Sequence, residues 1–142
     1  MRISAEPSTD PQDYPFAHDI RVRFAETDAM RIVHHGNYLA YFEEARVEFL
    51  DHIGHPYTSW RDDGVQSPVL ESYVRYRQPL HFAERFSVYV SLDSVTRATF
   101  NMAYLITVAD EVRTTGITVH GCTTLDGRPT RLPGWLRELG AA

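Results

Sequence analysis

The chain has 142 residues, of which 43% are hydrophobic, and it carries a formal net charge of -5. This length suits one domain with one hydrophobic core, and the acidic charge argues against a general nucleic-acid surface, which would be basic. All 14 basic residues are arginines, which excludes a lysine nucleophile or Schiff base. The single cysteine, Cys122, excludes an internal disulfide and leads us to expect a reducing, cytoplasmic location with no membrane contact.

The first 16 residues are polar and contain Pro7, Pro11 and Pro15, so we expect a flexible tail before a single domain at residues 17–142. The tail lacks the apolar core of a secretory signal. Residues 19–24 then alternate between apolar and polar side chains. This period predicts a half-buried strand with Ile20, Val22 and Phe24 on one face.

A long helix is predicted for residues 37–53, because apolar side chains recur at helical spacing. One face carries Tyr38, Phe42, Ala45, Phe49 and Ile53, flanked by Leu39, Tyr41 and Leu50. An arc of this width indicates a helix that is covered on most sides. Gly54 and Pro56 end the helix, and residues 57–66 are expected to form a polar loop.

Four strands are predicted at residues 68–78, 85–92, 99–108 and 111–125, followed by a short helix at residues 133–139. Short links between the strands indicate that successive strands are antiparallel neighbours. Helices do not alternate with strands, which argues against a doubly wound fold. The order predicts an α+β protein, with a five-stranded antiparallel sheet curled around one long helix.

The segment before the helix carries the candidate chemistry. Asp28 follows the first strand, and the turn His34-His35-Gly36-Asn37 opens the helix. A carboxylate that faces the positive end of a helix can attack an activated acyl group or activate water. The free backbone N–H groups of the first turn can receive the negative charge that develops on the carbonyl oxygen. Asp28 has a simpler alternative role as a turn or helix cap.

This block resembles the active-site segment of the 4-hydroxybenzoyl-CoA thioesterase family, whose members are hotdog-fold acyl-CoA thioesterases. The matching positions are Thr27, Asp28, Ala29, Val33, His35, Asn37, Tyr38, Phe42, Glu43, Glu44, Ala45 and Arg46. The resemblance implies a hotdog fold and Asp28 as nucleophile or general base, with the backbone N–H of His35 polarising the thioester carbonyl. It also implies homodimers or homotetramers with active sites at the subunit interface. We expect no metal and no cofactor, since coenzyme A is part of the substrate.

Further substrate contacts are expected from residues around this block, namely Arg31, His34, Gly36, Asn37, Tyr38 and Arg97. Asn37 has a simpler role as a helix N-cap, and Tyr38 has one as a core residue. Arg31 stands where the family usually has glycine, so it either obstructs the approach to the site or binds an anionic group. The segment around Arg97 often supplies cations to the phosphates of coenzyme A in the family, and a solvated turn is the alternative.

Two more side chains of the predicted helix are notable. Glu44 is a backup catalytic candidate, because another branch of hotdog thioesterases places its catalytic carboxylate on this helix. Arg46 falls inside the apolar arc, so it should be buried with a carboxylate partner, and Glu43 stands at i, i+3 spacing. His120 shares a strand face with Cys122, but we expect Cys122 to be a small buried residue rather than part of a dyad.

Two other functions remain open from the sequence. A hotdog enoyl-CoA hydratase would use an aspartate and a histidine to add water across a double bond. A non-catalytic acyl-CoA-binding protein could share the fold without the reaction. The acyl group, and the choice between coenzyme A and an acyl-carrier protein, are also open.

Overall fold

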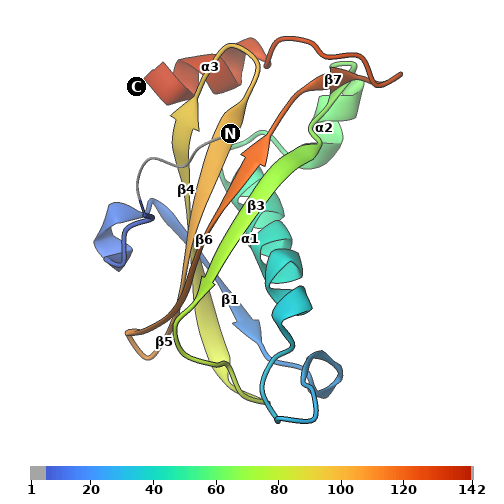
Figure 1. Ribbon diagram of the computed structural model, residues 1–142. Coiled ribbons are helices and arrows are strands. Elements are labelled where there is room, and N and C mark those ends of the chain that lie inside the picture. The colour runs from blue at the N-terminus through green and yellow to red at the C-terminus, as the bar shows by residue number, and fades with distance from the viewer. Residues whose placement is uncertain (1–5, 142) are drawn as a thin grey trace.

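The computed structural model describes residues 6–141 and contains one sheet wrapped around one long helix (Figure 1). The five main strands are β1 (Phe16–Arg21), β3 (Val69–Tyr76), β4 (Arg85–Val95), β5 (Phe100–Val108) and β6 (Glu111–His120). The helices are α1 (Tyr38–His52), α2 (Tyr57–Asp62) and α3 (Gly134–Ala141), and two short strands, β2 (Val65–Gln66) and β7 (Thr123–Thr124), pair with each other. The α+β class and the long helix are thus confirmed.

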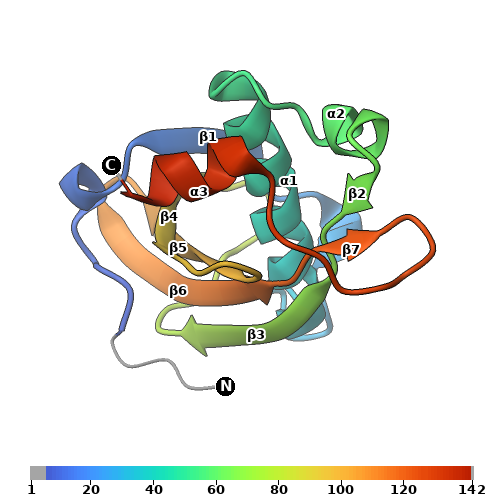
Figure 2. The same ribbon diagram turned by 90° about the horizontal axis from the view of Figure 1, so that it is seen from above.

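The five-stranded sheet is antiparallel and has the order β1-β4-β5-β6-β3. The expectation that all successive strands are neighbours is wrong for β3 and β4, because β3 pairs with β6 and β4 lies between β1 and β5. The link from β3 to β4 pairs instead with the segment before α1. Ile32 forms a bridge with His81, and the Val33 N–H donates to the Leu80 carbonyl at 2.9 Å. The curl of the sheet around α1 lets a short link make this crossing (Figure 2).

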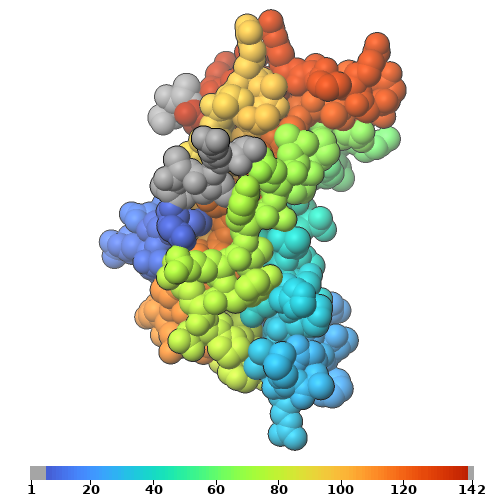
Figure 3. All heavy atoms as spheres, viewed as in Figure 1, coloured from blue at the N-terminus to red at the C-terminus, as the bar shows by residue number. Residues whose placement is uncertain are grey.

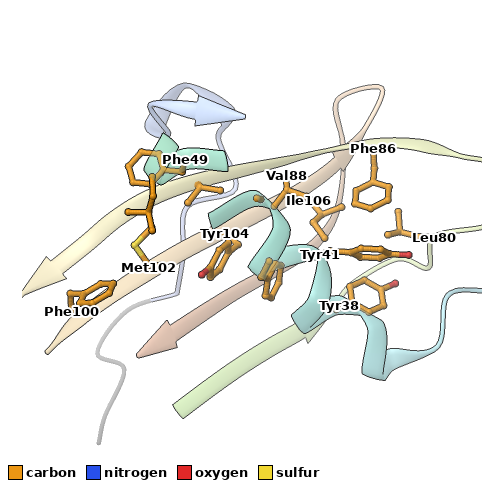
Figure 4. Close-up of a cluster of buried hydrophobic side chains, with 14 of the residues drawn as sticks. Tyr38, Tyr41, Phe49, Leu80, Phe86, Val88, Phe100, Met102, Tyr104 and Ile106 are labelled. Atoms are coloured by element: carbon orange, nitrogen blue, oxygen red, sulfur yellow. The ribbon is translucent and has the colours of Figure 1, made fainter. Parts of the chain in front are cut away.

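The core lies between α1 and the concave face of the sheet (Figure 4). The ring of Phe42 stacks on Tyr104 of β5, with centroids 4.3 Å apart. Gly116 of β6 leaves space for this ring, since a Cβ there would lie 2.4 Å from Phe42. Helix α1 buries Tyr38, Tyr41, Phe42, Ala45, Phe49 and Leu50, whereas Leu39 is exposed. The predicted apolar arc is therefore present and packs against the concave face of the sheet. The helix is not covered on most sides, however, because its opposite face, with Leu39 and Val47, is exposed.

Several predicted boundaries differ from the observed ones. Strand β1 ends at Arg21, and the exposed Phe24 begins a 3₁₀ turn, Phe24–Glu26, rather than facing the core. The predicted polar loop at residues 57–66 contains α2, which places Trp60 in the core. Residues 1–5 of the expected tail lie outside the described residues. Farther along that segment, Pro11–Asp13 form a 3₁₀ turn, and Tyr14 packs in a cluster with Leu105.

Strand β3 forms one edge of the sheet, beside α1 (Figure 3). Four of its large apolar side chains are exposed: Val69, Leu70, Tyr73 and Tyr76. An edge strand presents unpaired N–H and C=O groups that can pair with another chain. No helix among residues 6–141 is long and apolar enough to cross a membrane.

Candidate active site

Asp28 begins a tight turn between two short extended segments that meet at a bridge between Thr27 and Val33. The Arg31 N–H donates to the Asp28 carbonyl at 2.9 Å, and the Asp28 N–H donates to the Ile32 carbonyl at 3.0 Å. One carboxylate oxygen, Oδ1, accepts from the Met30 N–H at 2.8 Å. The capping role is therefore present, but it occupies only one oxygen. Oδ2 accepts no hydrogen bond from the residues that the structure describes.

The N–H of His35, at the start of the long helix, is a free backbone donor within the described residues. A 3₁₀ turn, His35–Asn37, precedes α1. The Gly36 N–H donates to Nδ1 of His34 at 3.0 Å, the Asn37 N–H donates to the His34 carbonyl at 2.9 Å, and the Tyr38 N–H donates to the His35 carbonyl. The His35 N–H has no acceptor among residues 6–141. This is the N–H that the family resemblance singled out.

Asp28 and His35 line the same pocket, which has a volume of about 290 Å³. Its walls come from the Asp28 turn, the start of α1, the end of β3 and the link after it: Met30, Ile32, Val33, Tyr38, Tyr76, Arg77, Gln78 and Pro79. Tyr76 donates its hydroxyl to the His35 carbonyl at 3.2 Å, and its ring packs edge-on against Tyr38 at 4.9 Å. The pocket is therefore mostly apolar, with a carboxylate and a helix start at its rim. Burial raises the pKa of Tyr38, so its hydroxyl stays neutral.

Arg31 lies on a second hollow, of about 510 Å³, that Asp28 also lines. The other walls are Phe24, Thr27, Ala29 and Phe82, and the rings of Phe24 and Phe82 meet edge-on at 5.5 Å. The backbone of Arg31 has a φ of 66°, in the left-handed region that favours glycine. This conformation gives a structural reason for the glycine at this position in the family that the chain resembles. Asp28 thus stands between an apolar pocket and a hollow that carries an arginine.

A hydrogen-bonded network that sequence reasoning missed holds the Asp28 turn against the helix. The backbone carbonyl of Glu26 accepts from the His34 N–H and from Nδ2 of Asn37, both at 2.9 Å. Asn37 therefore ties the two segments together, and its side chain does not cap the helix as we had expected. Glu26 Oε1 accepts from the Tyr41 hydroxyl at 2.9 Å and from the Arg23 N–H at 2.8 Å. Burial alone would raise the pKa of Glu26, but these hydrogen bonds lower it.

The sequence pattern of the thioesterase-like superfamily matches residues 22–139. The chain belongs to this superfamily. A protein of Aquifex aeolicus named "Putative esterase" is 40% identical over 125 residues, covering 88% of this chain and 97% of that protein. The crystal structure of a hypothetical protein from Aquifex aeolicus matches with a TM-score of 0.84 and 38% identity, covering 89% of this chain and 99% of that chain. The crystal structure of DHNA-CoA thioesterase from Staphylococcus aureus matches with a TM-score of 0.81 and 30% identity, covering 87% of this chain and 84% of that chain.

These likenesses confirm the hotdog fold and make the protein a thioester hydrolase. Within this thioesterase, the single chain brings Asp28, His35, Tyr38 and, on the adjoining hollow, Arg31 together. His34 caps the helix with Nδ1, and its ring packs at a tilt against that of His35, with centroids 4.2 Å apart, without lining the pocket. Gly36 likewise contributes its N–H to the cap rather than to the pocket.

Two other candidates lie away from this pocket. Arg97 sits between β4 and β5, at the end of the sheet near α3, whereas the segment before α1 lies at the opposite end (Figure 1). Glu44 pairs with Nε2 of His18 on β1 at 2.7 Å and does not line the Asp28 pocket. Within residues 6–140, no three His, Cys, Asp or Glu side chains are grouped to hold a metal ion.

His120 and Arg46 take part in a separate buried network. Nε2 of His120 lies 2.6 Å from the Thr118 hydroxyl, which lies 2.7 Å from that of Tyr104. Arg46 donates Nη1 to the same Tyr104 hydroxyl at 3.0 Å. His120 therefore pairs with Thr118 rather than with Cys122. The carboxylate expected beside Arg46 is only weakly present, because Glu43 approaches no closer than 3.9 Å.

Proposed function

We propose that this thioesterase hydrolyses an acyl-coenzyme A: acyl-CoA and water give a free carboxylic acid and the CoA thiol. The observation that carries the proposal is that the free Oδ2 of Asp28 and the free N–H of His35 belong to residues on one pocket. A thioester carbonyl bound there would accept from the His35 N–H while its carbon faces the carboxylate. Loss of one such donor costs on the order of 3 kcal/mol in comparable sites.

Two routes share this geometry. In the first, Oδ2 of Asp28 attacks the carbonyl carbon, the C–S bond breaks, and the thiolate leaves and is protonated; water then hydrolyses the mixed anhydride. In the second, Asp28 takes a proton from water as the water attacks the carbonyl carbon, and the thiolate leaves as the tetrahedral intermediate collapses. In both routes the charge that develops on the carbonyl oxygen is stabilised by the start of the helix.

Coenzyme A, rather than a carrier protein, is the proposed leaving group. The Staphylococcus aureus relative is named a DHNA-CoA thioesterase, and the block from Thr27 to Arg46 resembles 4-hydroxybenzoyl-CoA thioesterases. Arg77 lines the Asp28 pocket and Arg31 lines the adjoining hollow, so both are positioned to meet phosphate oxygens. Arg97 would reach a CoA only in an assembly of subunits.

The variant Asp28→Asn tests the proposal. It keeps an oxygen for the Met30 N–H but lacks a nucleophile or base, so kcat should fall by about 10²–10⁴-fold. Thiol release from a panel of short, long and aromatic acyl-CoAs measures this, and calorimetry with free CoA should show that binding is retained. Asp63→Asn, at an exposed position, is the matched control. Full turnover by Asp28→Asn would refute the assignment.

We also propose that two copies pair through β3, which is an open edge with exposed Val69, Leu70, Tyr73 and Tyr76. Paired antiparallel around a two-fold axis, the edges would satisfy each other's N–H and C=O groups and bury these side chains. A dimer of this kind could pair again into a tetramer.

The oligomeric state should therefore depend on Tyr73. Analytical ultracentrifugation of the wild-type chain should show a dimer or tetramer, and Tyr73→Arg should shift it to monomers because two arginines would meet near the two-fold axis. Leu125→Arg changes an exposed apolar side chain outside β3 and should leave the assembly intact. A monomeric wild-type chain, or an unchanged Tyr73→Arg assembly, would contradict this arrangement.

A further inference from the structure

Arg46 is a largely buried cation whose charge is poorly compensated. Its side chain is 14% exposed, and its one hydrogen bond within residues 6–141 runs from Nη1 to the Tyr104 hydroxyl. Burial raises the pKa of Tyr104, so this partner is a neutral phenol. The nearest carboxylate among the described residues is Glu43, whose Oε2 lies 3.9 Å from Nη2 on a side chain that is 71% exposed. A guanidinium has five N–H donors, so four of those of Arg46 have no close acceptor in the described part of the chain.

Arg113 is buried to a similar extent as Arg46, but its charge is compensated by carboxylates. Its side chain is 11% exposed, and Nη1 and Nη2 donate to the two carboxylate oxygens of Glu84 at 3.0 and 3.1 Å. It also donates to Glu111 and to the Pro79 carbonyl. Because a buried charge without a partner is unfavourable, the contrast indicates that Arg46 meets an anion that is not among the residues that the structure describes.

Arg46 opens onto a pocket of about 310 Å³ that is distinct from the Asp28 pocket. Most of its walls are apolar or aromatic: Val47, Leu50, Tyr57, Trp60, Val69 and Phe100. His120 also lines it, but burial, together with the nearby Arg46 charge, lowers the pKa of His120 to about 3. The imidazole is therefore neutral, and the pocket has a mainly apolar wall, with Arg46 as its one cation and the exposed carboxylate of Glu43 as its one anion among the described residues.

The chemistry of this pocket favours a carboxylate on a hydrocarbon body. A carboxylate matches the planar fork of a guanidinium and carries a single charge. A phosphate would bring up to two charges to one arginine, with Glu43 on the same rim. Apolar walls of this kind suit the hydrocarbon part of a small ligand, with the polar group fixing its orientation.

The proposed dimer would bring this pocket to the reactive site. Val69, at the start of β3, lines the Arg46 pocket, and Tyr76, at the end of β3, lines the Asp28 pocket. A two-fold axis through the middle of β3 places the start of one strand beside the end of its partner. The Arg46 pocket of one subunit would then adjoin the Asp28 pocket of the other.

From this juxtaposition we propose that Arg46 binds a second carboxylate, carried at the far end of the acyl group. The substrates are then CoA thioesters of dicarboxylic acids, aliphatic or aromatic, whose hydrocarbon part lies against Trp60 and Phe100. This assignment rests on the proposed function for the thioester end, whereas the carboxylate site itself is a property of Arg46 and its pocket.

Matched pairs of substrates test the proposal by thiol release: adipoyl-CoA against hexanoyl-CoA, and 4-carboxybenzoyl-CoA against benzoyl-CoA. The wild-type enzyme should favour the carboxylated member by about tenfold or more in kcat/KM, the scale of one hydrogen-bonded charge pair. In Arg46→Gln the ratio should fall to about one, and in Arg46→Lys it should fall partly, since the charge stays but the fork is lost. Arg61→Gln, the same charge change on exposed α2, should keep the wild-type ratio.

Binding of adipate alone separates this inference from the thioesterase proposal. Fluorescence of the wild-type protein should respond to adipate because Trp60 lines the pocket, and the response should be lost in Arg46→Gln. If no acyl-CoA is hydrolysed while adipate binds, only the proposed reaction fails. No adipate binding together with equal rates within each pair would overturn the Arg46 assignment.

Two further outcomes would also overturn it. If Arg46→Gln splits the oligomer, the missing anion is a carboxylate of the partner subunit. If Arg46→Gln weakens binding of free CoA and leaves the substrate ratios unchanged, the anion is a phosphate of the leaving group. Should Arg46→Gln fail to fold, the partial loss expected for Arg46→Lys decides the matter.

Discussion

Arg31 closes the Asp28 turn in a left-handed backbone conformation, with a φ of 66°. For a residue with a side chain this conformation costs roughly 1–2 kcal/mol. Its side chain is exposed and lines the hollow beside Asp28. Strain at a position that adjoins Asp28, the proposed reactive carboxylate, is consistent with a role for the arginine that a glycine could not fill.

Arg31→Gly should therefore raise the free energy of unfolding by up to about 1 kcal/mol, since glycine accepts this conformation without strain. If Arg31 also meets CoA phosphates, KM for acyl-CoAs should rise in the same variant. Urea unfolding and steady-state kinetics measure the two effects. Arg131 is exposed and does not have a positive φ, so Arg131→Gly should lower stability instead. Stability and KM both equal to wild type would contradict this role for Arg31.

The contacts of individual side chains are also what the sequence predicted least well. The pattern identified Asp28 and His35, but nothing in it pointed to the link from Asn37 to the Glu26 carbonyl or from Tyr41 to Glu26 Oε1. These contacts join residues 11 and 15 positions apart across a turn whose path depends on the whole fold. Asn37 was expected to cap the helix because that role is local, and the tertiary contact displaced it.

At the scale of elements, helix α1 meets the sheet at Gly116. A Cβ at this position would lie 2.4 Å from one ring carbon of Phe42 and 2.6 Å from another. The Phe42 ring cannot easily move away from a new Cβ, because it also stacks on the ring of Tyr104. The absence of a side chain at Gly116 therefore sets how closely the helix sits in the curl of the sheet.

Gly116→Ala should lower the free energy of unfolding by about 1–3 kcal/mol through overpacking. Phe42→Leu alone should also destabilise, by loss of packing. The double variant should lose less than the sum of the two, because the smaller side chain makes room for the new methyl group. Denaturant unfolding of all four proteins gives the coupling, and strictly additive losses would show that the two residues do not share this contact.

The elements themselves were predictable to different degrees. Strand β4 and helix α1 were predicted well because each has one buried face, which leaves a period in the sequence. Strand β5 was also predicted, although it is buried on both faces. Helix α2 was missed because Trp60 is its one buried residue, so no period exists. The prediction that β3 and β4 pair with each other was wrong. The length of a link limits only how far apart two strand ends can lie, whereas the curl of the sheet decides which strands pair.

At the scale of the whole molecule, the buried His120 and the half-buried Glu84 make stability depend on pH. Burial and the Arg46 charge lower the pKa of His120 from 6.5 to about 3. Hydrogen bonds from Arg113, which outweigh the opposing effect of burial, lower the pKa of Glu84 from 4.5 to about 2. In both cases the unfolded chain binds a proton at a higher pH than the folded one. Stability is therefore lost as pH falls, first through His120 and then through Glu84.

Between pH 6.5 and pH 4.5 the loss should come largely from His120, at up to about 1.4 kcal/mol per pH unit. His120→Gln keeps a polar group near Thr118 without a titrating ring, so its unfolding free energy should be flatter over this range. Chemical denaturation at several pH values measures the slope. His52→Gln, at an exposed position, should keep the wild-type slope. An equally steep slope in His120→Gln would assign the effect to another group.

The sequence by itself determined the order of strand, helix and strands, and it pointed to one short block as the candidate for the chemistry. Both follow from the types of residue present and from the spacing of apolar side chains, which are local properties of a few neighbouring positions. Only the tertiary structure decided that Oδ2 of Asp28 and the His35 N–H stay unpaired within residues 6–141, and that Arg46 has no close counter-ion there. Pairing depends on distances between segments far apart in the chain, and those distances exist only once the sheet has closed around the helix.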